Sequence, residues 1–120
     1  MIFSTENVVF NTDNLGYIIE KNDKFIYQYR RKVSIQDIEI PLHLKEDEKH
    51  KFFHRFGFFK LDKFWINPKN IALIHEDYLD RKNNETAAKV HLFINFINGL
   101  SVDVLIEAER WKSWKDTRLR

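Results

Sequence analysis

The stretch from position 51 to 60 reads Lys-Phe-Phe-His-Arg-Phe-Gly-Phe-Phe-Lys and interleaves aromatic with basic side chains. Exposed aromatic rings stack on unpaired bases, and lysine and arginine neutralise phosphates, so the segment predicts binding of single-stranded RNA. The alternative interpretation is that the phenylalanines form a hydrophobic core and the basic residues decorate its surface.

Basic residues are clustered although the net charge is only +2. One cluster is residues 30–32, another is residues 49–60, which contain four basic residues and no acid, and a third is residues 110–120. If these clusters fold together they form one basic face; if they fold apart they are only solvated surface. The candidate nucleic-acid-binding residues are Arg30, Arg31, Lys32, Lys51, Arg55 and Lys60. We expect RNA rather than DNA as the ligand.

Signals for catalysis are weak. His50 and His54 have the spacing of zinc ligands on a helix, but we expect a strand there and find no residue that completes the set. The absence of cysteine excludes disulfides, thiolate catalysis and cysteine-based zinc sites. A metal-dependent nuclease remains a third hypothesis, built on Asp103, Glu107 and Glu109 with Glu46, Glu48 and Lys49. We predict a non-enzymatic protein with no catalytic residues, metal or cofactor.

Alternating apolar residues predict the elements that position these groups. Residues 90–96 and 100–106 alternate on either side of Asn98-Gly99, which predicts a β-hairpin. Residues 107–115 carry acids first and bases last, as a terminal helix would, with Trp111 and Trp114 on one face.

Further strands are expected at 15–20, 24–29, 38–44, 52–59 and 71–76. The alternation slips at Gln36-Asp37, which predicts a bulge or a tight bend. The polar runs 45–51 and 77–89 are expected to be loops.

An internal repeat is indicated at an offset of 56 positions, with chance similarity as the alternative. Residues 10–18 are echoed by residues 66–74, and Asn11, Asn14, Ile18 and Glu20 each meet the same residue type in the second copy. The halves would be about 1–56 and 57–120. Each asparagine pair marks a turn that leads into a strand.

One mainly β domain, residues 1–120, is therefore expected: a small β-barrel or a strongly curved sheet with a short C-terminal helix. Without a membrane-spanning run or a signal-peptide pattern, we expect a cytoplasmic protein with no membrane partner.

Residues 66–74, together with the hairpin through Asn98-Gly99, resemble the repeats of FlbD-like and LytTR-type domains. LytTR domains bind DNA, but their His-Arg-Ser run is not kept, because His54-Arg55 continues into Phe56, so no DNA-binding residue carries over.

The β-rich pattern of the whole chain, the basic aromatic stretch 51–60 and the closing tryptophan helix are similar to PrgU-type proteins. These are small regulators of conjugative plasmids with a PUA-like barrel. This resemblance implies RNA binding and post-transcriptional control of neighbouring genes. The alternative function is a protein-interaction module, or a homodimer, that uses exposed aromatic residues.

Overall fold

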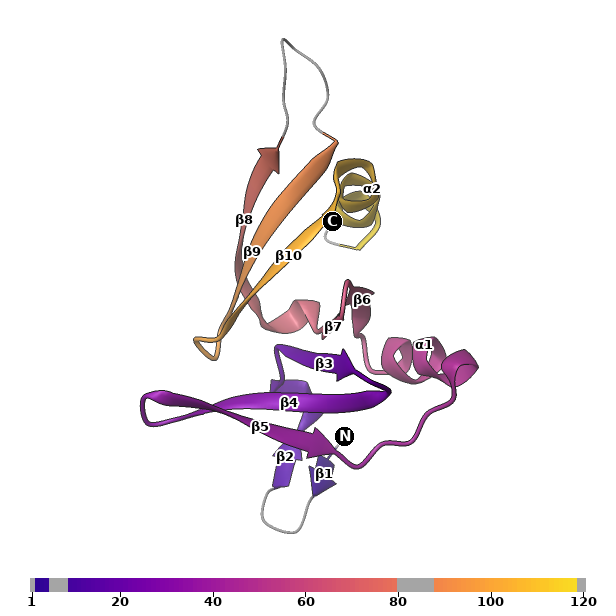
Figure 1. Ribbon diagram of the computed structural model, residues 1–120, viewed down its shortest axis with the longest axis vertical. Coiled ribbons are helices and arrows are strands. Elements are labelled where there is room, and N and C mark those ends of the chain that lie inside the picture. Colours follow the sequence, from indigo (N-terminus) through magenta and orange to yellow (C-terminus); the bar gives the residue numbers. More distant parts are fainter. Residues whose placement is uncertain (1, 5–8, 80–87, 119–120) are drawn as a thin grey trace. The chain divides into compact units, whose positions relative to one another are not determined.

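The computed structural model describes residues 2–4, 9–79 and 88–118. The chain divides into two compact units, Met1–Asn70 and Ile71–Arg120. Each unit is mainly β and each contains one α-helix, as Figure 1 shows. The mainly β class and the C-terminal helix are thus confirmed, while the sheets formed by the described residues are open and do not close into a barrel.

The first unit holds a five-stranded antiparallel sheet in the order β5-β4-β3-β7-β6 and a separate two-stranded sheet, β1-β2. Its elements are β1 (Ile2–Ser4), β2 (Val9–Asn11), the 3₁₀ turn η1 (Thr12–Asn14), β3 (Tyr17–Lys21), β4 (Lys24–Arg31), β5 (Ser34–Ile40), α1 (Glu46–Arg55), β6 (Phe59–Leu61), β7 (Phe64–Ile66) and the 3₁₀ turn η2 (Pro68–Asn70).

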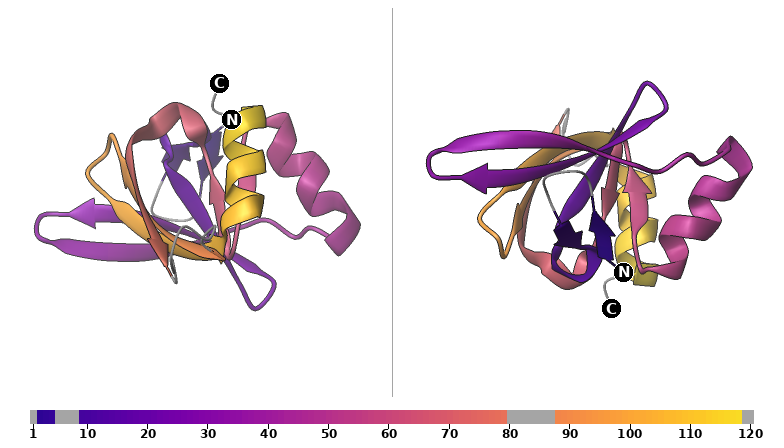
Figure 2. Two further views of the ribbon diagram at one scale, coloured as in Figure 1. Left: turned by 90° about the horizontal axis from the view of Figure 1, so that it is seen from above. Right: turned by 90° about the horizontal axis from the view of Figure 1, so that it is seen from below.

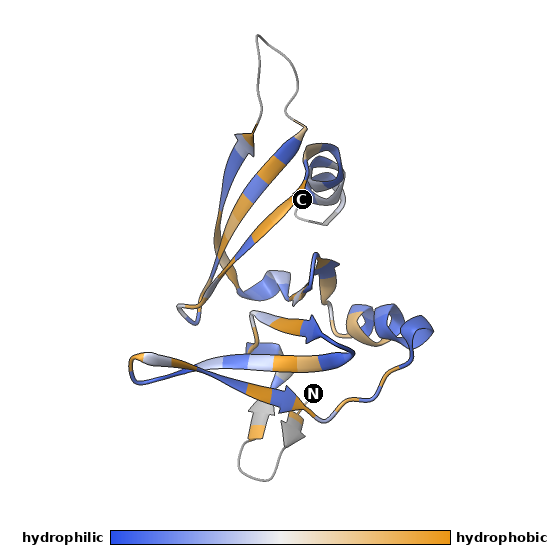
Figure 3. Cartoon of the chain, viewed as in Figure 1, coloured by the Kyte–Doolittle hydropathy of each residue, from blue (hydrophilic) through white to orange (hydrophobic). Residues whose placement is uncertain are grey.

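The second unit holds a three-stranded antiparallel sheet in the order β10-β9-β8. Its elements are β8 (Ile71–Leu79), β9 (Lys89–Phe96), β10 (Ser101–Glu107) and α2 (Ala108–Arg118). The predicted hairpin and terminal helix are both confirmed. The alternation along β9 is visible in Figure 3. The buried residues of β9 and β10 are the alternating apolar ones, Val90, Leu92, Ile94, Phe96, Val102, Val104 and Ile106, and Trp111 of α2 is buried as well. The predicted loop 77–89 is wrong at both ends, because β8 continues to Leu79 and β9 begins at Lys89; residues 80–87 lie outside the described part.

Helix α1 overturns two predictions, because residues 45–51 are not a loop and residues 52–59 are not one strand. Three acids occupy its first turn, and His54 and Arg55 occupy its last, which suits the helix dipole. Gly57, with φ +84°, ends the helix: its N–H donates to the His54 carbonyl at 3.0 Å, and that of Phe58 donates to the Phe53 carbonyl at 2.9 Å. This pair of bonds is the Schellman motif, which needs a left-handed residue where the glycine lies.

The bulge expected at Gln36-Asp37 is also wrong, because β4 and β5 pair in an unbroken register from Phe25↔Ile40 to Arg31↔Ser34. Ile35 does lie on the face opposite Ile38 and Ile40, and its side chain is 54% exposed. The break in the apolar alternation therefore marks the place where the β4–β5 hairpin extends beyond the core. From there to the turn, neither face of β5 is buried, so the alternation is not required.

The core of the first unit forms between α1 and the sheet. Phe53 of α1 stacks on Trp65 of β7 with ring centroids 4.3 Å apart, and Phe25 of β4 lies 5.2 Å from Phe53. All three side chains are at most 1% exposed. Burying aromatic rings of this size contributes several kcal/mol, on the order of 2–3 per ring, so this cluster attaches α1 to the sheet.

The two asparagine turns share the predicted geometry. Asn11 Oδ1 accepts the Asp13 N–H at 3.0 Å, and Asn67 Oδ1 accepts the Lys69 N–H at 3.2 Å. Each bond opens a 3₁₀ turn that leads into the next strand. No helix in the described part of the chain is long and apolar enough to cross a membrane.

Candidate nucleic-acid interface

The hairpin of β4 and β5 carries the first basic cluster at its free end. Arg30 and Arg31 end β4, Lys32 lies in the turn, and all three side chains are exposed. We call these three residues the tip cluster. The turn is ordered by Ser34, whose Oγ donates to the Arg31 carbonyl at 3.1 Å and accepts Gln36 Nε2 at 2.9 Å. Residues 28–36 contain no acid, so this end of the hairpin has a net positive charge.

Two tyrosines precede the tip cluster on one face of β4. Tyr27 and Tyr29 stack with centroids 5.9 Å apart and an interplanar angle of 20°. Both side chains are half-buried. Because side chains alternate along a strand, Arg31 follows them on the same face. This face therefore combines aromatic surface with a guanidinium group.

The other face of β4 joins the hairpin to the rest of its sheet. The Tyr17 hydroxyl donates to Gln28 Oε1 at 2.6 Å, and Gln28 Nε2 donates to Asp37 Oδ1 at 2.9 Å. Burial, with smaller effects from Asp37 and Tyr27, raises the pKa of Tyr17 to about 12. Tyr17 thus remains a neutral hydrogen-bond donor, which fixes the direction in which the hairpin leaves β3.

The second basic cluster, Lys51 and Arg55, lies on the outer surface of α1. The two exposed residues are four positions apart, so they share one side of the helix. The Arg55 guanidinium lies 5.7 Å from the Phe56 ring centroid. We call this pair the helix cluster.

The structure keeps the tip cluster and the helix cluster apart. Lys49 of α1 lies 3.6 Å from Asp23, which precedes β4, so α1 contacts the end of the hairpin remote from its tip. The eight residues of β4 then span about 25 Å at roughly 3.3 Å per residue. In both views of Figure 2 the β4–β5 turn and α1 point in opposite directions. The two clusters therefore form two basic patches and not one compact face.

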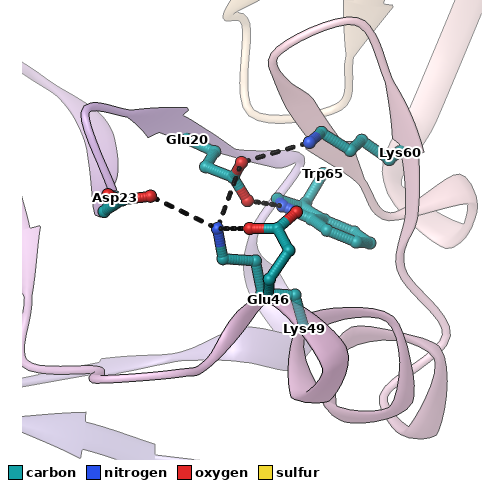
Figure 4. A network of polar contacts seen from close by, with 6 residues as sticks. All are labelled: Glu20, Asp23, Glu46, Lys49, Lys60 and Trp65. Atoms are coloured by element: carbon teal, nitrogen blue, oxygen red, sulfur yellow. Dashed lines mark hydrogen bonds and ion pairs between the residues drawn. The ribbon is translucent and has the colours of Figure 1, made fainter.

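Lys60, the last predicted ligand of nucleic acid, takes part in an internal network, drawn in Figure 4. Its Nζ donates to Glu20 Oε2 at 3.1 Å and lies 5.6 Å from the ring centroid of Trp65. Trp65 Nε1 donates to Glu20 Oε1 at 3.1 Å. Phosphate binding by Lys60 would have to compete with this carboxylate, so Lys60 is the weakest member of the predicted site.

Lys49 extends the network to α1. The Lys49 side chain is only 4% exposed, and its Nζ lies 2.7 Å from Glu46, 3.6 Å from Glu20 and 3.6 Å from Asp23. The hydrogen bond with Glu46, and then the other two carboxylates, raise the pKa of Lys49 against the opposing effect of burial. Burial opposes the ionisation of Glu20, but the hydrogen bonds from Trp65 and Lys60 outweigh it and lower the pKa of Glu20. Both groups are therefore held in their charged forms.

The second unit contains a similar arrangement that the sequence patterns did not reveal. Glu76 of β8 accepts Trp111 Nε1 at 3.0 Å and Lys115 Nζ at 3.1 Å, and it also accepts the Tyr78 hydroxyl. The Lys115 ammonium lies 5.9 Å from the Trp111 ring centroid. The one usable signal was the pairing of Glu20 with Glu76 at the repeat offset, but the tryptophan and lysine partners come from different elements in the two units.

Among the described residues, the side chains considered for metal chemistry do not form a cluster of three ligands. His50 and His54 lie one turn apart on α1 with ring centroids 5.6 Å apart, and His50 packs edge-on against Trp65 at 5.1 Å. Within residues 2–4, 9–79 and 88–118, no three His, Asp or Glu side chains are grouped as metal ligands would be. Of the proposed nuclease acids, Asp103, Glu107 and Glu109 belong to the second unit, and Glu46 and Glu48 to the first.

An open hollow of about 370 Å³ lies beside the β1–β2 hairpin. It is lined by Ile2, Val9, Asn11, Asn14 and Tyr27. Ile2 and Val9 are 67% and 70% exposed, so these two apolar side chains are largely open to solvent.

Comparison of the chain with protein-family models, with curated proteins and with solved structures found no match. The function must accordingly be inferred from these residues and their geometry.

Proposed function

We propose that the protein is a small non-enzymatic regulator that binds single-stranded RNA through the β4–β5 hairpin. The observation that carries the proposal is the tip cluster, three exposed cations at the end of a projecting hairpin with no acid between residues 28 and 36. Phosphate groups are the natural partners of such a cluster, because binding releases condensed counterions.

The stacked tyrosines favour RNA with unpaired bases over duplex DNA. Aromatic rings add about 1–3 kcal/mol for each base that stacks on them, and stacking requires bases that are not already paired. Tyr27 and Tyr29 lie on β4, next to the tip cluster. One RNA molecule can therefore stack its bases on the tyrosines while its phosphates contact the tip cluster. The helix cluster of Lys51 and Arg55 would then bind phosphate at a second, separate place. Control of the translation or stability of neighbouring transcripts is the regulatory role that such binding supports.

Fluorescence anisotropy with a labelled single-stranded RNA pool, titrated at several salt concentrations, tests this proposal. The double variant Arg30→Glu/Arg31→Glu should bind at least about tenfold more weakly, and the slope of log K against log salt should decrease by about 0.7 for each phosphate that the variant no longer binds. The matched control is Arg110→Glu/Lys112→Glu on α2, which changes the net charge equally at two exposed positions and should retain most of the affinity.

Three outcomes have different meanings. Loss of affinity in the hairpin variant alone supports the proposal, and equal loss in both variants indicates only non-specific attraction by net charge. Binding of duplex DNA without binding of single-stranded RNA would change the ligand to DNA, since a two-stranded β-ribbon also fits the major groove. The alternative function is a protein-interaction module or a homodimer that uses exposed aromatic residues. The exposed apolar residues that would favour a homodimer are aliphatic instead, namely Ile2, Val9 and Leu73.

A further inference from the structure

The hairpins β1–β2 and β6–β7 are equivalent in the 56-residue repeat down to their pairing register. Phe3 pairs with Phe10 and Ser4 with Val9 in the first, while Phe59 pairs with Ile66 and Lys60 with Trp65 in the second. Every one of these positions is shifted by 56. Each hairpin then leads through an asparagine turn and a 3₁₀ turn into a longer strand, β3 or β8.

The β6–β7 hairpin shows what the edge of such a longer strand accepts. β7 pairs antiparallel with β3 in the register Tyr17↔Ile66 and Ile18↔Trp65. The Asn67 N–H donates to the Gly16 carbonyl at 2.8 Å, and the Glu20 N–H donates to the Lys63 carbonyl at 2.8 Å. The pairing leaves Tyr17 only 3% exposed and Trp65 fully buried.

The corresponding edge of β8 is open. β8 is the terminal strand of the sheet β10-β9-β8, and among the described residues no strand pairs with its other side. Leu73, equivalent to Tyr17, is 58% exposed. An open strand edge with an exposed leucine is a template for the addition of another strand.

The β1–β2 hairpin lacks the partner that its equivalent has. Within the described residues β1 and β2 pair only with each other. Val9 is 70% exposed, whereas its equivalent Trp65 is 0% exposed; Ile2 is 67% exposed, whereas its equivalent Phe58 is 2% exposed. An isolated two-stranded hairpin is marginally stable in water, so this one requires a sheet to join.

We infer that the β1–β2 hairpin of one copy of the chain adds to the β8 edge of a second copy, in the register that β7 adopts on β3. This register sets Val9 opposite Ile74 of the second copy and position 10 opposite its Leu73. Each copy carries one β1–β2 hairpin and one open β8 edge. In a closed dimer the hairpin of each copy pairs with the β8 edge of the other. The interface is independent of the tip cluster and of nucleic-acid binding.

The size of Val9 fits this pairing. In the first unit the carboxylate of Glu20 receives its indole N–H from Trp65 of the added hairpin. In the second unit Glu76 already receives its indole N–H from Trp111 of α2. A hairpin that joins β8 therefore needs no tryptophan at the position of Trp65, and valine occupies it.

Disulfide trapping tests the register directly, because the chain has no cysteine of its own. A tagged Val9→Cys chain is mixed with an untagged Ile74→Cys chain and oxidised. By analogy with Ile18 and Trp65, these positions form a hydrogen-bonded pair with Cα atoms about 5.5 Å apart, which a disulfide can span. We expect a mixed disulfide dimer on a non-reducing gel. Val33→Cys with Ile74→Cys is the control, since Val33 is fully exposed in the β4–β5 turn. Trapping no greater than in this control would overturn the inference.

The oligomeric state provides the second test. Sedimentation of the unmodified protein should give a dimer, and Leu73→Lys or Val9→Lys should raise the dimer dissociation constant by about tenfold or more. Leu105→Lys is the matched control, because Leu105 is 52% exposed on β10, at the opposite edge of the same sheet, and it should leave the dimer intact. A monomer at all concentrations, or a disulfide formed only within single chains of Val9→Cys/Ile74→Cys, would overturn the proposal.

Discussion

Glu20 and Glu76 lie at equivalent positions 56 residues apart, and each carboxylate accepts hydrogen bonds from a tryptophan indole and from a lysine ammonium. These hydrogen bonds are 3.0 to 3.2 Å long. In the first unit the tryptophan comes from β7, and in the second it comes from α2. The two units thus surround an equivalent glutamate with the same kinds of donor, but the donors come from different elements. Only the strand that carries the glutamate is equivalent in both units.

Stability should depend on pH through these two glutamates. Their hydrogen bonds lower both pKa values below the ordinary value of 4.5, against the opposing effect of burial. A carboxyl group with a lower pKa in the folded state stabilises the fold above pH 4.5, and this contribution is lost as the pH falls through the folded-state pKa. Urea denaturation of Glu20→Gln should show a loss of about 1–3 kcal/mol at pH 7 that shrinks at lower pH.

The bond between Trp65 and Glu20 should appear as a coupling energy. Trp65→Phe removes the indole N–H, and Glu20→Gln removes the charged acceptor. Because the two residues act on one interaction, the double variant should be less destabilised than the sum of the single variants, by about 0.5–3 kcal/mol. Equilibrium unfolding of the four proteins measures this difference. Pairing Trp65→Phe with Glu39→Gln, an exposed position on β5, should give additive effects, and equal coupling in both cycles would contradict the proposed bond.

Gly57→Ala should destabilise the end of α1 by about 1–2 kcal/mol through backbone conformation alone. Gly57 has φ +84°, and an added Cβ would meet no atom within 4 Å, so steric contact makes no contribution. Gly57→Asn should cost less, because asparagine tolerates the left-handed region better. Thermal unfolding followed by far-ultraviolet circular dichroism measures both variants. An alanine variant as stable as the unmodified protein would show that the Schellman ending is not needed.

Lys32→Gly should separate RNA binding from folding. Lys32 has φ 57°, a left-handed conformation that costs a residue with a side chain about 1 kcal/mol, so glycine should leave the stability unchanged or raise it slightly. The affinity for single-stranded RNA should nevertheless fall, because the tip cluster then has one cation fewer. Lys32→Ala is the control. It should bind RNA as weakly as the glycine variant, but alanine still has to adopt the unfavourable left-handed conformation at this position. Undiminished affinity in both variants would remove Lys32 from the site.

Several elements followed from local pattern alone. The β9–β10 hairpin, the terminal helix and the asparagine turns at Asn11 and Asn67 all form where the sequence predicts them. Each depends on interactions over a few residues: the two-residue period of a half-buried strand, the dipole of a helix, or a side chain that bonds the backbone two positions ahead.

The prediction of a strand in place of helix α1 was wrong because its phenylalanines are apolar on more than one side. Phe52, Phe53 and Phe56 suit either a buried strand or a helix, and periodicity does not distinguish them. The acids at Glu46–Glu48 and the glycine after Phe56 were the usable signals for a helix. Packing of Phe53 on Trp65 decides the outcome, since it gives one helical face a core to enter.

The basic residues of the candidate site were also predictable only in part from the sequence. The sequence by itself determined which residues are basic and that they occur in clusters, because composition is local. Only the tertiary structure decided that Arg30, Arg31 and Lys32 lie at the tip of a hairpin, that Lys51 and Arg55 lie on a distant helix, and that Lys60 is paired with Glu20. The physical reason is that whether two charges reinforce one another depends on their distance in space, and pairing across 40 positions is set by how strands and helices pack.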